Sequence, residues 1–346
     1  MTSTERSGGD VMTPAAVRVP VATVWSAPSA VRPSDAAAVR DDPDVAAWIA
    51  AMTPDEQTSS AVVTQLLLGD PVVVDEVRPD GWARVVAPAQ AAPTLDPRGY
   101  PGWMRASHLA APVPAGPGPL VVDALSTTLV DAPTGRPVLP GVGLGTLLTP
   151  AGPALGPAPG GASDGAPGGA LHGASGGTSG GTPGRASGGA RGGWLPVHVP
   201  GRPEPLWART ADLAPAPSAP PTGAEALAMA RRLLGAVYVW GGLSTLGIDC
   251  SGLVHLTWRR LGVRLPRDAH DQAAAAPAVA PGTERPGDLY CFARPGRRVH
   301  HVAVVVTPPD GTTPPRILHA STGAHRVVEE PMPPDRAATL TGAHRP

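Results

Sequence analysis

A long tract of small residues interrupts this chain and limits where its cores can lie. From Ala151 to Gly193 the sequence is almost entirely Gly, Ala, Ser, Pro and Thr. Such a segment has too little apolar surface to offset the entropy lost on ordering, so we expect it to be mobile. The remainder of the 346 residues is long enough for two or three domains.

Short apolar runs typical of β-strands lie on both sides of this tract. After it, Trp194–Val199 and Leu206–Arg209 are separated by turn residues. Upstream, Gly81–Val86 and Gly102–Arg105 repeat the order of a Gly-Trp strand, a loop and a second Trp strand. The two halves therefore indicate a weak internal repeat.

This repeat resembles bacterial SH3-like barrels in tandem. The resemblance implies one all-β barrel over 16–111, with an insertion at 27–60, and a second over 120–213. The Gly-rich tract would be an insertion at 151–193 in the second barrel, which is tolerable because loop-closure entropy grows only logarithmically with length. Two unrelated β segments joined by a linker are the alternative.

The remaining segment, 222–346, has the pattern of an α+β domain. Ala224–Leu234 is predicted to be a helix because Leu227, Ala230 and Leu234 share one face. A second helix is predicted to begin at Cys250 and to end at Gly262. Strand-like runs follow at 288–292, 301–306, 316–321 and 326–329. Helices followed by consecutive strands predict an antiparallel sheet covered by helices.

Cys250 is the first candidate for chemistry because it stands where a loop turns into a helix. Asp249 can cap that helix, and the free N–H groups of the first turn favour a thiolate. The alternative is an inert, buried cysteine, the usual state of this residue type. The second cysteine, Cys291, alternates with Tyr290 in a strand and is expected to be a core residue.

Several motifs around Cys250 occur in a familiar order. They are Tyr238-Val239-Trp240-Gly241-Gly242, Asp249-Cys250-Ser251-Gly252, Leu265-Pro266-Arg267-Asp268, Pro286-Gly287-Asp288, His301-Val302-Ala303-Val304 and Leu318-His319-Ala320. With them, 222–346 resembles the NlpC family (NlpC/P60 type) of papain-like murein endopeptidases. The resemblance implies a papain-like α+β fold with Cys250 as nucleophile, His301 as base and His319 as the residue that orients His301.

The residue chemistry is consistent with this assignment. A Cys–His pair needs a third group to fix the imidazole tautomer, and the chain contains no asparagine to serve as one. His300 competes with His301, but adjacent strand residues point to opposite faces, so only one can act. The family's histidine precedes an apolar-small-apolar run, which selects His301. Tyr238, Asp249 and Ser251 would line the oxyanion and substrate site.

Substrate recognition is also implied by the resemblance. A subset of the family, with tandem SH3-like domains, cuts free L-Ala-γ-D-Glu-diaminopimelate peptides between D-glutamate and the diamino acid. There Arg267 would bind the glutamate α-carboxylate and Asp268 the free α-ammonium. Asp70 and Tyr100 of the first barrel would close that end of the cleft. Ala269 stands where relatives commonly carry serine, which removes one expected hydrogen bond.

Three functions follow as hypotheses. The first is a cytoplasmic recycling peptidase for murein peptides, the second a secreted hydrolase of intact cell wall, and the third a non-catalytic wall-binding protein. The presence of Cys250, His301 and His319 disfavours the third. No apolar stretch after Met1–Asp10 suits a signal peptide, which favours the first, although an upstream start would allow secretion.

Other partners are not expected. The formal net charge of −1 gives no reason to expect nucleic acid or an anionic membrane, and we expect a monomer without a cofactor. A zinc site from Cys250, Cys291, His301 and His319 has the right ligand types but no closely spaced ligand pair, so no metal is expected.

Overall fold

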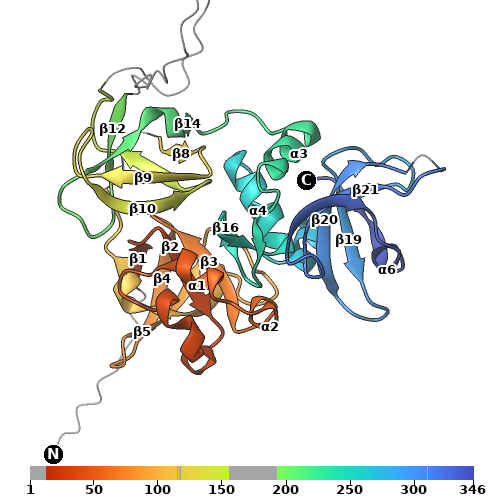
Figure 1. Cartoon of the computed structure of the whole chain (residues 1–346), viewed down its shortest axis with the longest axis horizontal. Helices are drawn as coiled ribbons and strands as arrows, with labels where there is room; N and C mark the ends of the chain where they lie inside the picture. Colours follow the sequence, from red (N-terminus) through yellow and green to blue (C-terminus); the bar gives the residue numbers. More distant parts are fainter. Residues whose placement is uncertain (1–12, 115, 117, 156–192, 310) are drawn as a thin grey trace, which may run out of the picture.

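The computed structural model describes residues 13–114, 116, 118–155, 193–309 and 311–346. It contains two all-β domains and a C-terminal α+β domain, with helix α4 (Cys250–Arg260) lying between the β domains and the C-terminal sheet (Figure 1). Most of the Gly-rich tract, 156–192, lies outside the described residues, so its expected mobility stays a prediction. Within the described ranges, no helix is both long enough and apolar enough to span a bilayer.

The first domain is a seven-stranded antiparallel sheet in the order β3-β2-β6-β5-β4-β1-β7. Its strands are β1 (Thr13–Val17), β2 (Val21–Trp25), β3 (Val62–Leu67), β4 (Pro71–Val77), β5 (Trp82–Ala87), β6 (Tyr100–Arg105) and β7 (Leu109–Ala110). The segment predicted as an insertion forms short helices between β2 and β3. They are η1 (Pro28–Ala30), η2 (Pro33–Ala38), α1 (Val45–Ala50) and α2 (Pro54–Gln57).

The second domain repeats that topology. Its order, β10-β9-β13-β12-β11-β8-β14, equals the first with seven added to every strand number. The strands are β8 (Leu120–Val122), β9 (Ser126–Val130), β10 (Pro137–Gly143), β11 (Leu147–Pro150), β12 (Trp194–His198), β13 (Leu206–Arg209) and β14 (Leu213–Pro215). The predicted all-β character of both domains is confirmed, whereas their SH3-like identity stays a prediction.

The C-terminal domain places helices against a nine-stranded sheet in the order β16-β17-β15-β22-β21-β20-β19-β23-β18. Its helices are α3 (Gly223–Arg231), α4, α5 (Ala269–Ala275) and α6 (Pro334–Ala337). Its strands are β15 (Val237–Tyr238), β16 (Leu243–Ser244), β17 (Gly247–Ile248), β18 (Ala278–Val279), β19 (Leu289–Ala293), β20 (Val299–Thr307), β21 (Arg316–Ser321), β22 (Arg326–Pro331) and β23 (Leu340–His344). The predicted antiparallel sheet is present, with one parallel pair, β15 and β17.

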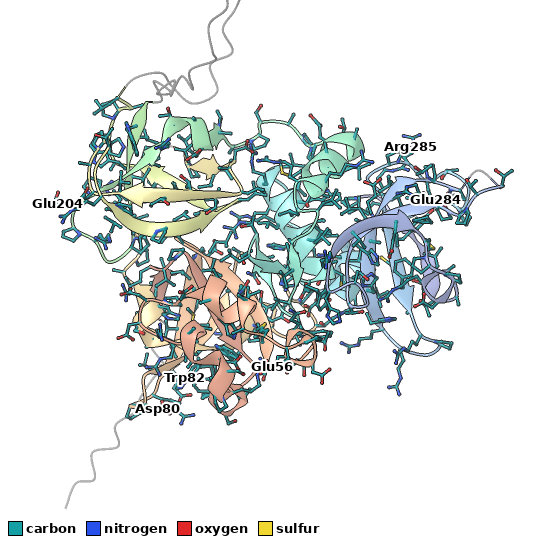
Figure 2. All side chains as sticks on the ribbon, in the orientation of Figure 1. Glu56, Asp80, Trp82, Glu204, Glu284 and Arg285 are labelled. Atoms are coloured by element: carbon teal, nitrogen blue, oxygen red, sulfur yellow. The ribbon has the colours of Figure 1, made fainter. Side chains whose placement is uncertain are left out.

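One apolar core joins the first domain to the C-terminal domain. Trp25 and Trp48, whose ring centroids lie 5.8 Å apart, belong to the same buried cluster as Val239 and Leu253. Figure 2 shows side chains filling the space between the first domain and α4. Because burial of each large apolar side chain stabilises by about 1.5–3 kcal/mol, this shared core fixes the first domain against helix α4.

Candidate active site

Helix α4 begins at Cys250 because Asp249 caps it. Asp249 Oδ1 accepts a hydrogen bond from the Gly252 N–H at 2.6 Å, and Oδ2 accepts one from the Gly241 N–H at 2.8 Å. A Cβ at position 252 would lie 2.3 Å from the carbonyl oxygen of Gly242, so glycine is required for this close approach. The cap therefore fixes both the helix start and the loop that faces it.

Cys250 lies in the wall of a cavity of about 360 Å³. The first domain contributes Ser60, Val63 and Tyr100 to the lining, and the C-terminal domain contributes Tyr238, Trp240, Asp249, Ser251, Asp268, Ala269, His270, Val299 and His300. The cavity is therefore built between two domains, as the sequence predicted for Tyr100.

His301 and His319 meet on neighbouring strands. From β20, His301 Nε2 lies 2.7 Å from His319 Nδ1 on β21, and both side chains are buried. The next strand, β22, places Glu330 Oε1 3.0 Å from His319 Nε2. A hydrogen bond from the Val302 backbone ties Cys250 to β20 at the residue after His301. The predicted pairing of His301 with His319 is thus present, and Glu330 is an additional group that the sequence did not reveal.

His300 and His301 have different surroundings. His300 is exposed and lines the cavity, whereas His301 is buried and has the imidazole of His319 as a partner. A general base needs a partner that fixes its tautomer. The geometry therefore favours His301 as the base, although His300 is closer to solvent.

Burial favours the neutral forms of the thiol and of both imidazoles. Burial, together with the Asp249 carboxylate, raises the pKa of Cys250 to about 12, despite hydrogen bonds from Val302 and Ser251 that favour the thiolate. Burial holds the pKa of His301 well below its usual value, and Arg336 lowers it further. Desolvation therefore opposes the resting thiolate that the helix start favours. A thiol proton must move to the base during attack.

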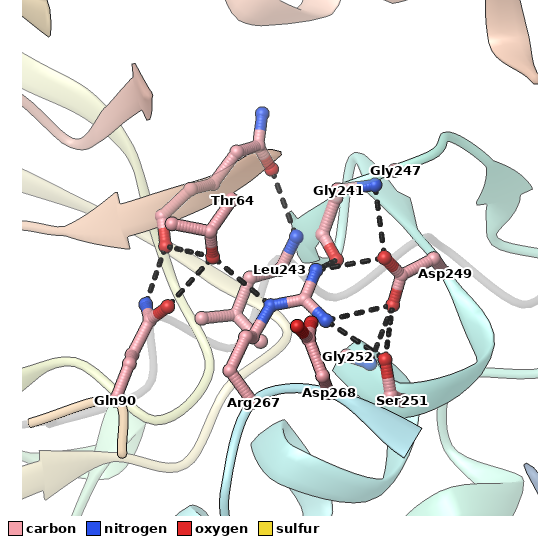
Figure 3. A network of polar contacts seen from close by, with 12 residues as sticks. Thr64, Gln90, Gly241, Leu243, Gly247, Asp249, Ser251, Gly252, Arg267 and Asp268 are labelled. Carbon is pink, nitrogen blue, oxygen red and sulfur yellow. Dashed lines mark hydrogen bonds and ion pairs between the residues drawn. The ribbon is translucent and has the colours of Figure 1, made fainter. Parts of the chain in front are cut away.

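The prediction that Arg267 binds the substrate carboxylate is also wrong for this arrangement. Its side chain is about 1% exposed, and its guanidinium donates to Asp249 Oδ1 at 3.0 Å and Oδ2 at 2.8 Å and to Ser251 Oγ at 2.9 Å (Figure 3). Nε donates to Thr64 Oγ1 at 2.9 Å and Nη2 to the Gly242 carbonyl at 3.2 Å. All three guanidinium nitrogens are therefore engaged in holding the loops around Cys250.

This network reaches into the first domain. Thr64 Oγ1, which accepts from Arg267, donates to Gln90 Oε1 at 2.6 Å, and Gln90 in turn donates to the Gln65 carbonyl at 2.7 Å (Figure 3). Gln65 Oε1 accepts from the Leu243 N–H at 3.0 Å. The first domain therefore supports the residues behind the nucleophile. Asp249 and Ser251, predicted to contact substrate, line the cavity but have polar atoms committed to this network.

Asp268 and Tyr100 come together as predicted. The Tyr100 hydroxyl donates to both carboxylate oxygens of Asp268, at 3.2 Å each. Asp268 occupies the N-cap position of α5, yet its side chain makes no capping hydrogen bond and instead faces the cavity. Burial raises the pKa of Asp268, and it also raises that of Tyr100, which keeps its proton. The pair offers a partly buried carboxylate that a cation can approach.

Asp70 does not belong to this site, and its predicted role is wrong. Its two oxygens accept from Arg259 at 2.6 and 3.0 Å, and one also accepts from the Leu67 N–H at 2.9 Å. It lines a separate cavity of about 270 Å³ where the three domains meet. An acidic residue at this turn binds the arginine of α4, a partner that lies 189 residues away in the sequence.

Two aromatic residues complete the cavity. Tyr238 is buried in the cavity wall, and burial beside Cys250 raises the pKa of its hydroxyl, so it remains a hydrogen-bond donor; its oxyanion role stays a prediction. Trp240 is 42% exposed and was not predicted from the sequence. Its place two residues after Tyr238 in the same motif was the available signal.

The described residues contain one group of candidate metal ligands, Asp268, His270 and Asp271, whose ligand atoms lie within 4.8 Å of one another. His270 Nε2 also contacts Thr94 Oγ1 at 2.8 Å. This group differs from the cysteine and histidine set considered from the sequence. Cys291 is buried in the core of β19, and Ala269 lines the cavity without a hydroxyl.

A capped helix with a cysteine at its start, hydrogen-bonded to the strand that carries the buried His301, is the arrangement expected of a cysteine peptidase of the papain-like type. A sequence profile of the NlpC/P60 family matches residues 235–342. The C-terminal domain is therefore an NlpC/P60 family domain, and the chain is a cysteine peptidase.

Two curated relatives match this chain over most of its length. The chain is 27% identical over 293 residues to a gamma-D-glutamyl-L-lysine dipeptidyl-peptidase of Bacillus subtilis, covering 83% of this chain and 84% of that protein. It is 27% identical over 301 residues to a protein of the same name from Bacillus cereus, covering 84% and 79%. The crystal structure of an NlpC/P60 family protein from Bacillus cereus is similar with a TM-score of 0.74 and 25% identity, covering 96% of this chain and 99% of that one.

Proposed function

We propose that this chain hydrolyses the bond between γ-D-glutamate and a diamino acid in murein stem peptides that carry a free N-terminal L-Ala. The names of the two relatives that match most of the chain support the bond type. The observation that carries the proposal is the Asp268–Tyr100 pair, which offers a carboxylate to the peptide ammonium in the cavity of Cys250. We further propose that it acts in the cytoplasm as a monomer, which cell fractionation and light scattering would test.

The reaction follows from the groups present. His301 takes the Cys250 proton as sulfur attacks the γ-carbonyl carbon, and the Tyr238 hydroxyl donates to the developing oxyanion. The C–N bond then breaks, and the protonated His301 returns its proton to the leaving amine of the diamino acid. Water, deprotonated by His301, hydrolyses the thioester and regenerates the thiol. No step requires a metal or cofactor.

The free amine should control selectivity. Acetylation of L-Ala removes the positive charge and leaves the partly buried Asp268 carboxylate without a cationic partner. We expect kcat/KM on L-Ala-γ-D-Glu-diaminopimelate to exceed that on its N-acetylated form by about a hundredfold or more, at about 1.4 kcal/mol per tenfold. Asp268→Asn should reduce this ratio strongly, and His270→Ala, a change at a neighbouring cavity residue, should leave it nearly unchanged.

A secreted hydrolase of intact wall is the competing function. It would show comparable kcat/KM values on the free and acetylated peptides, or efficient digestion of purified wall. A wall-binding protein without activity would bind wall sacculi but release no dipeptide from either substrate. Either result would contradict the proposal.

A further inference from the structure

Glu330 extends the histidine pair by one group. It lies on β22 and pairs with Ile317 of β21. Because Ile317 and His319 are two positions apart on β21, Glu330 lies on the same face of the sheet as His319. Its Oε1 is 3.0 Å from His319 Nε2, while His319 Nδ1 is 2.7 Å from His301 Nε2. The His319 side chain is 1% exposed and that of Glu330 is 36% exposed. The three groups thus form a line from the surface to the interior.

The protons along this line are fixed by elimination. A neutral imidazole carries one N–H and one acceptor nitrogen. Because His301 Nε2 is engaged with His319, the Cys250 proton can be accepted only on His301 Nδ1, so the resting proton of His301 is on Nε2. That N–H donates to His319 Nδ1, which must then be bare. The proton of His319 therefore lies on Nε2, where only an acceptor can face it, and Glu330 is that acceptor.

We propose that Glu330 is a positioning residue of this peptidase, whose carboxylate holds His319 in the Nε2–H tautomer and so keeps His301 Nδ1 free to take the thiol proton. This inference rests on the proposed roles of Cys250 and His301. Without the acceptor, His319 could carry its proton on Nδ1, and two N–H groups would then face each other across the His301–His319 contact.

Glu330 also supplies the charge that favours a protonated histidine pair. Burial lowers the pKa values of His301 and His319, and Arg336 of α6 lowers both further. His300 and His319 act in the same direction on His301, whereas Asp335 of α6 raises the pKa of His319. The hydrogen bond and charge of Glu330 are the largest influences that raise the pKa of His319. The hydrogen bond and charge of Glu330 therefore offset the pKa-lowering effect of Arg336 when His301 becomes positively charged.

Kinetics of Glu330 variants test the inference. We expect Glu330→Ala to lower kcat about tenfold to hundredfold, part of what general-base catalysis contributes, with KM changed less than about twofold. Glu330→Gln, which keeps an acceptor oxygen but loses the charge, should fall between this variant and the unchanged protein. The acid limb of the kcat profile should shift to lower pH in Glu330→Ala, because the pKa of the histidine pair falls.

Glu329 provides the matched control. It is adjacent in β22, points to the opposite face, and accepts a hydrogen bond from Arg231 at 2.9 Å. Glu329→Gln should keep kcat and its pH profile. An equal loss of kcat in Glu330→Ala and Glu329→Gln would show a general effect on β22 and would overturn the inference.

A readout without peptide substrate separates this inference from the proposed function. Histidine-selective ¹⁵N NMR of the full chain reports which ring nitrogen carries the proton, and iodoacetamide alkylation of Cys250, followed by peptide mass spectrometry, reports proton removal from the thiol. We expect His319 of the unchanged protein to be the Nε2–H tautomer. In Glu330→Ala we expect a mixture of the two His319 tautomers, and alkylation of Cys250 at pH 7 about tenfold slower than in the unchanged protein. If Glu330→Ala fails to fold, Glu330→Gln must show slowed alkylation. An unchanged tautomer and unchanged alkylation would overturn the inference even if the tripeptide proved to be the wrong substrate.

Discussion

The two β domains have the same strand order but different relations to the active site. The first contributes Tyr100 and Val63 to the cavity and Thr64 to the network around Arg267. The second contacts the C-terminal domain away from the cavity. The Asp123 carboxylate binds Arg232 and Arg260, and the Leu125 and Gly145 carbonyls accept from Thr245 and Arg259. A shared topology therefore does not give a shared role.

What differs is the side chains at equivalent strands and the packing of the insertion. In the first domain β6 begins with Tyr100, whose hydroxyl reaches Asp268, whereas β13 of the second begins with Leu206, which is buried in its own core. The insertion of the first domain carries Trp48 into the shared core. The first domain is thus part of the active site, while the second acts as a lateral support.

The largest expected effect of this difference is at Arg267. Arg267→Ala leaves the Asp249 carboxylate without its buried partner, which should destabilise the protein by about 3–5 kcal/mol and abolish activity. Arg232→Ala, which removes a partner of the partly exposed Asp123 beside the second domain, should cost about 1 kcal/mol or less and keep most activity. Urea unfolding and peptide hydrolysis measure both. Equal costs would remove the distinction between the two domains.

Acid should destabilise the C-terminal domain next most strongly. Burial, together with the charges of Arg259 and Arg267, lowers the pKa of His255 from 6.5 to about 4. On acidification the unfolded chain therefore binds a proton at His255 at a higher pH than the folded chain does. The contribution of this group to the free energy of unfolding is complete above pH 6.5 and is lost as pH falls from 6.5 to about 4. This single group should contribute a loss of about 3 kcal/mol, at 1.36 kcal/mol per pKa unit.

The lowered pKa values of His301 and His319 act in the same direction. Thermal melts from pH 7.5 to 4.5 should show a falling midpoint, and His255→Gln should flatten the fall. A midpoint that rises on acidification would contradict the buried neutral state of these histidines.

Tyr100→Phe should have a smaller effect, limited to selectivity. Removing the hydroxyl takes one hydrogen bond from Asp268 while the ring still fills the wall, so the preference for a free amine should change by about tenfold, equivalent to about 1.4 kcal/mol. The kcat/KM ratio of free and acetylated peptide measures it. Leu206→Met in the second domain is the control and should leave the ratio unchanged.

Asp70→Asn should have the smallest effect on activity. Its carboxylate binds Arg259 in a cavity away from Cys250, so the change should lower stability through that ion pair without altering amine selection. A loss of selectivity as large as that of Asp268→Asn would restore the role that the sequence predicted for Asp70.

Local patterns predicted much of this structure. The strand at 316–321 has its predicted bounds, and the helix at Cys250 begins where the Asp249 cap indicated. These features depend on neighbours in the sequence. The partners of Asp70 and Arg267 depend on which distant charges the fold brings near, and the sequence alone does not contain that information. Glu330 was missed because two glutamates that follow Val-Val in a strand are typical of a solvent-exposed strand end. The pairing of β22 with β21 nevertheless places Glu330 on the face of His319.

The central claim, that Cys250 is the nucleophile in a cavity closed by the first domain, has a direct test. Cys250→Ala and Cys291→Ala can be compared on L-Ala-γ-D-Glu-diaminopimelate, with release of the dipeptide L-Ala-γ-D-Glu measured by mass spectrometry. Cys250→Ala should be folded and inactive, because only the sulfur in the cavity wall is lost, and Cys291→Ala should keep most activity because its thiol lies in the core. Activity retained in Cys250→Ala and lost in a folded Cys291→Ala would contradict the account.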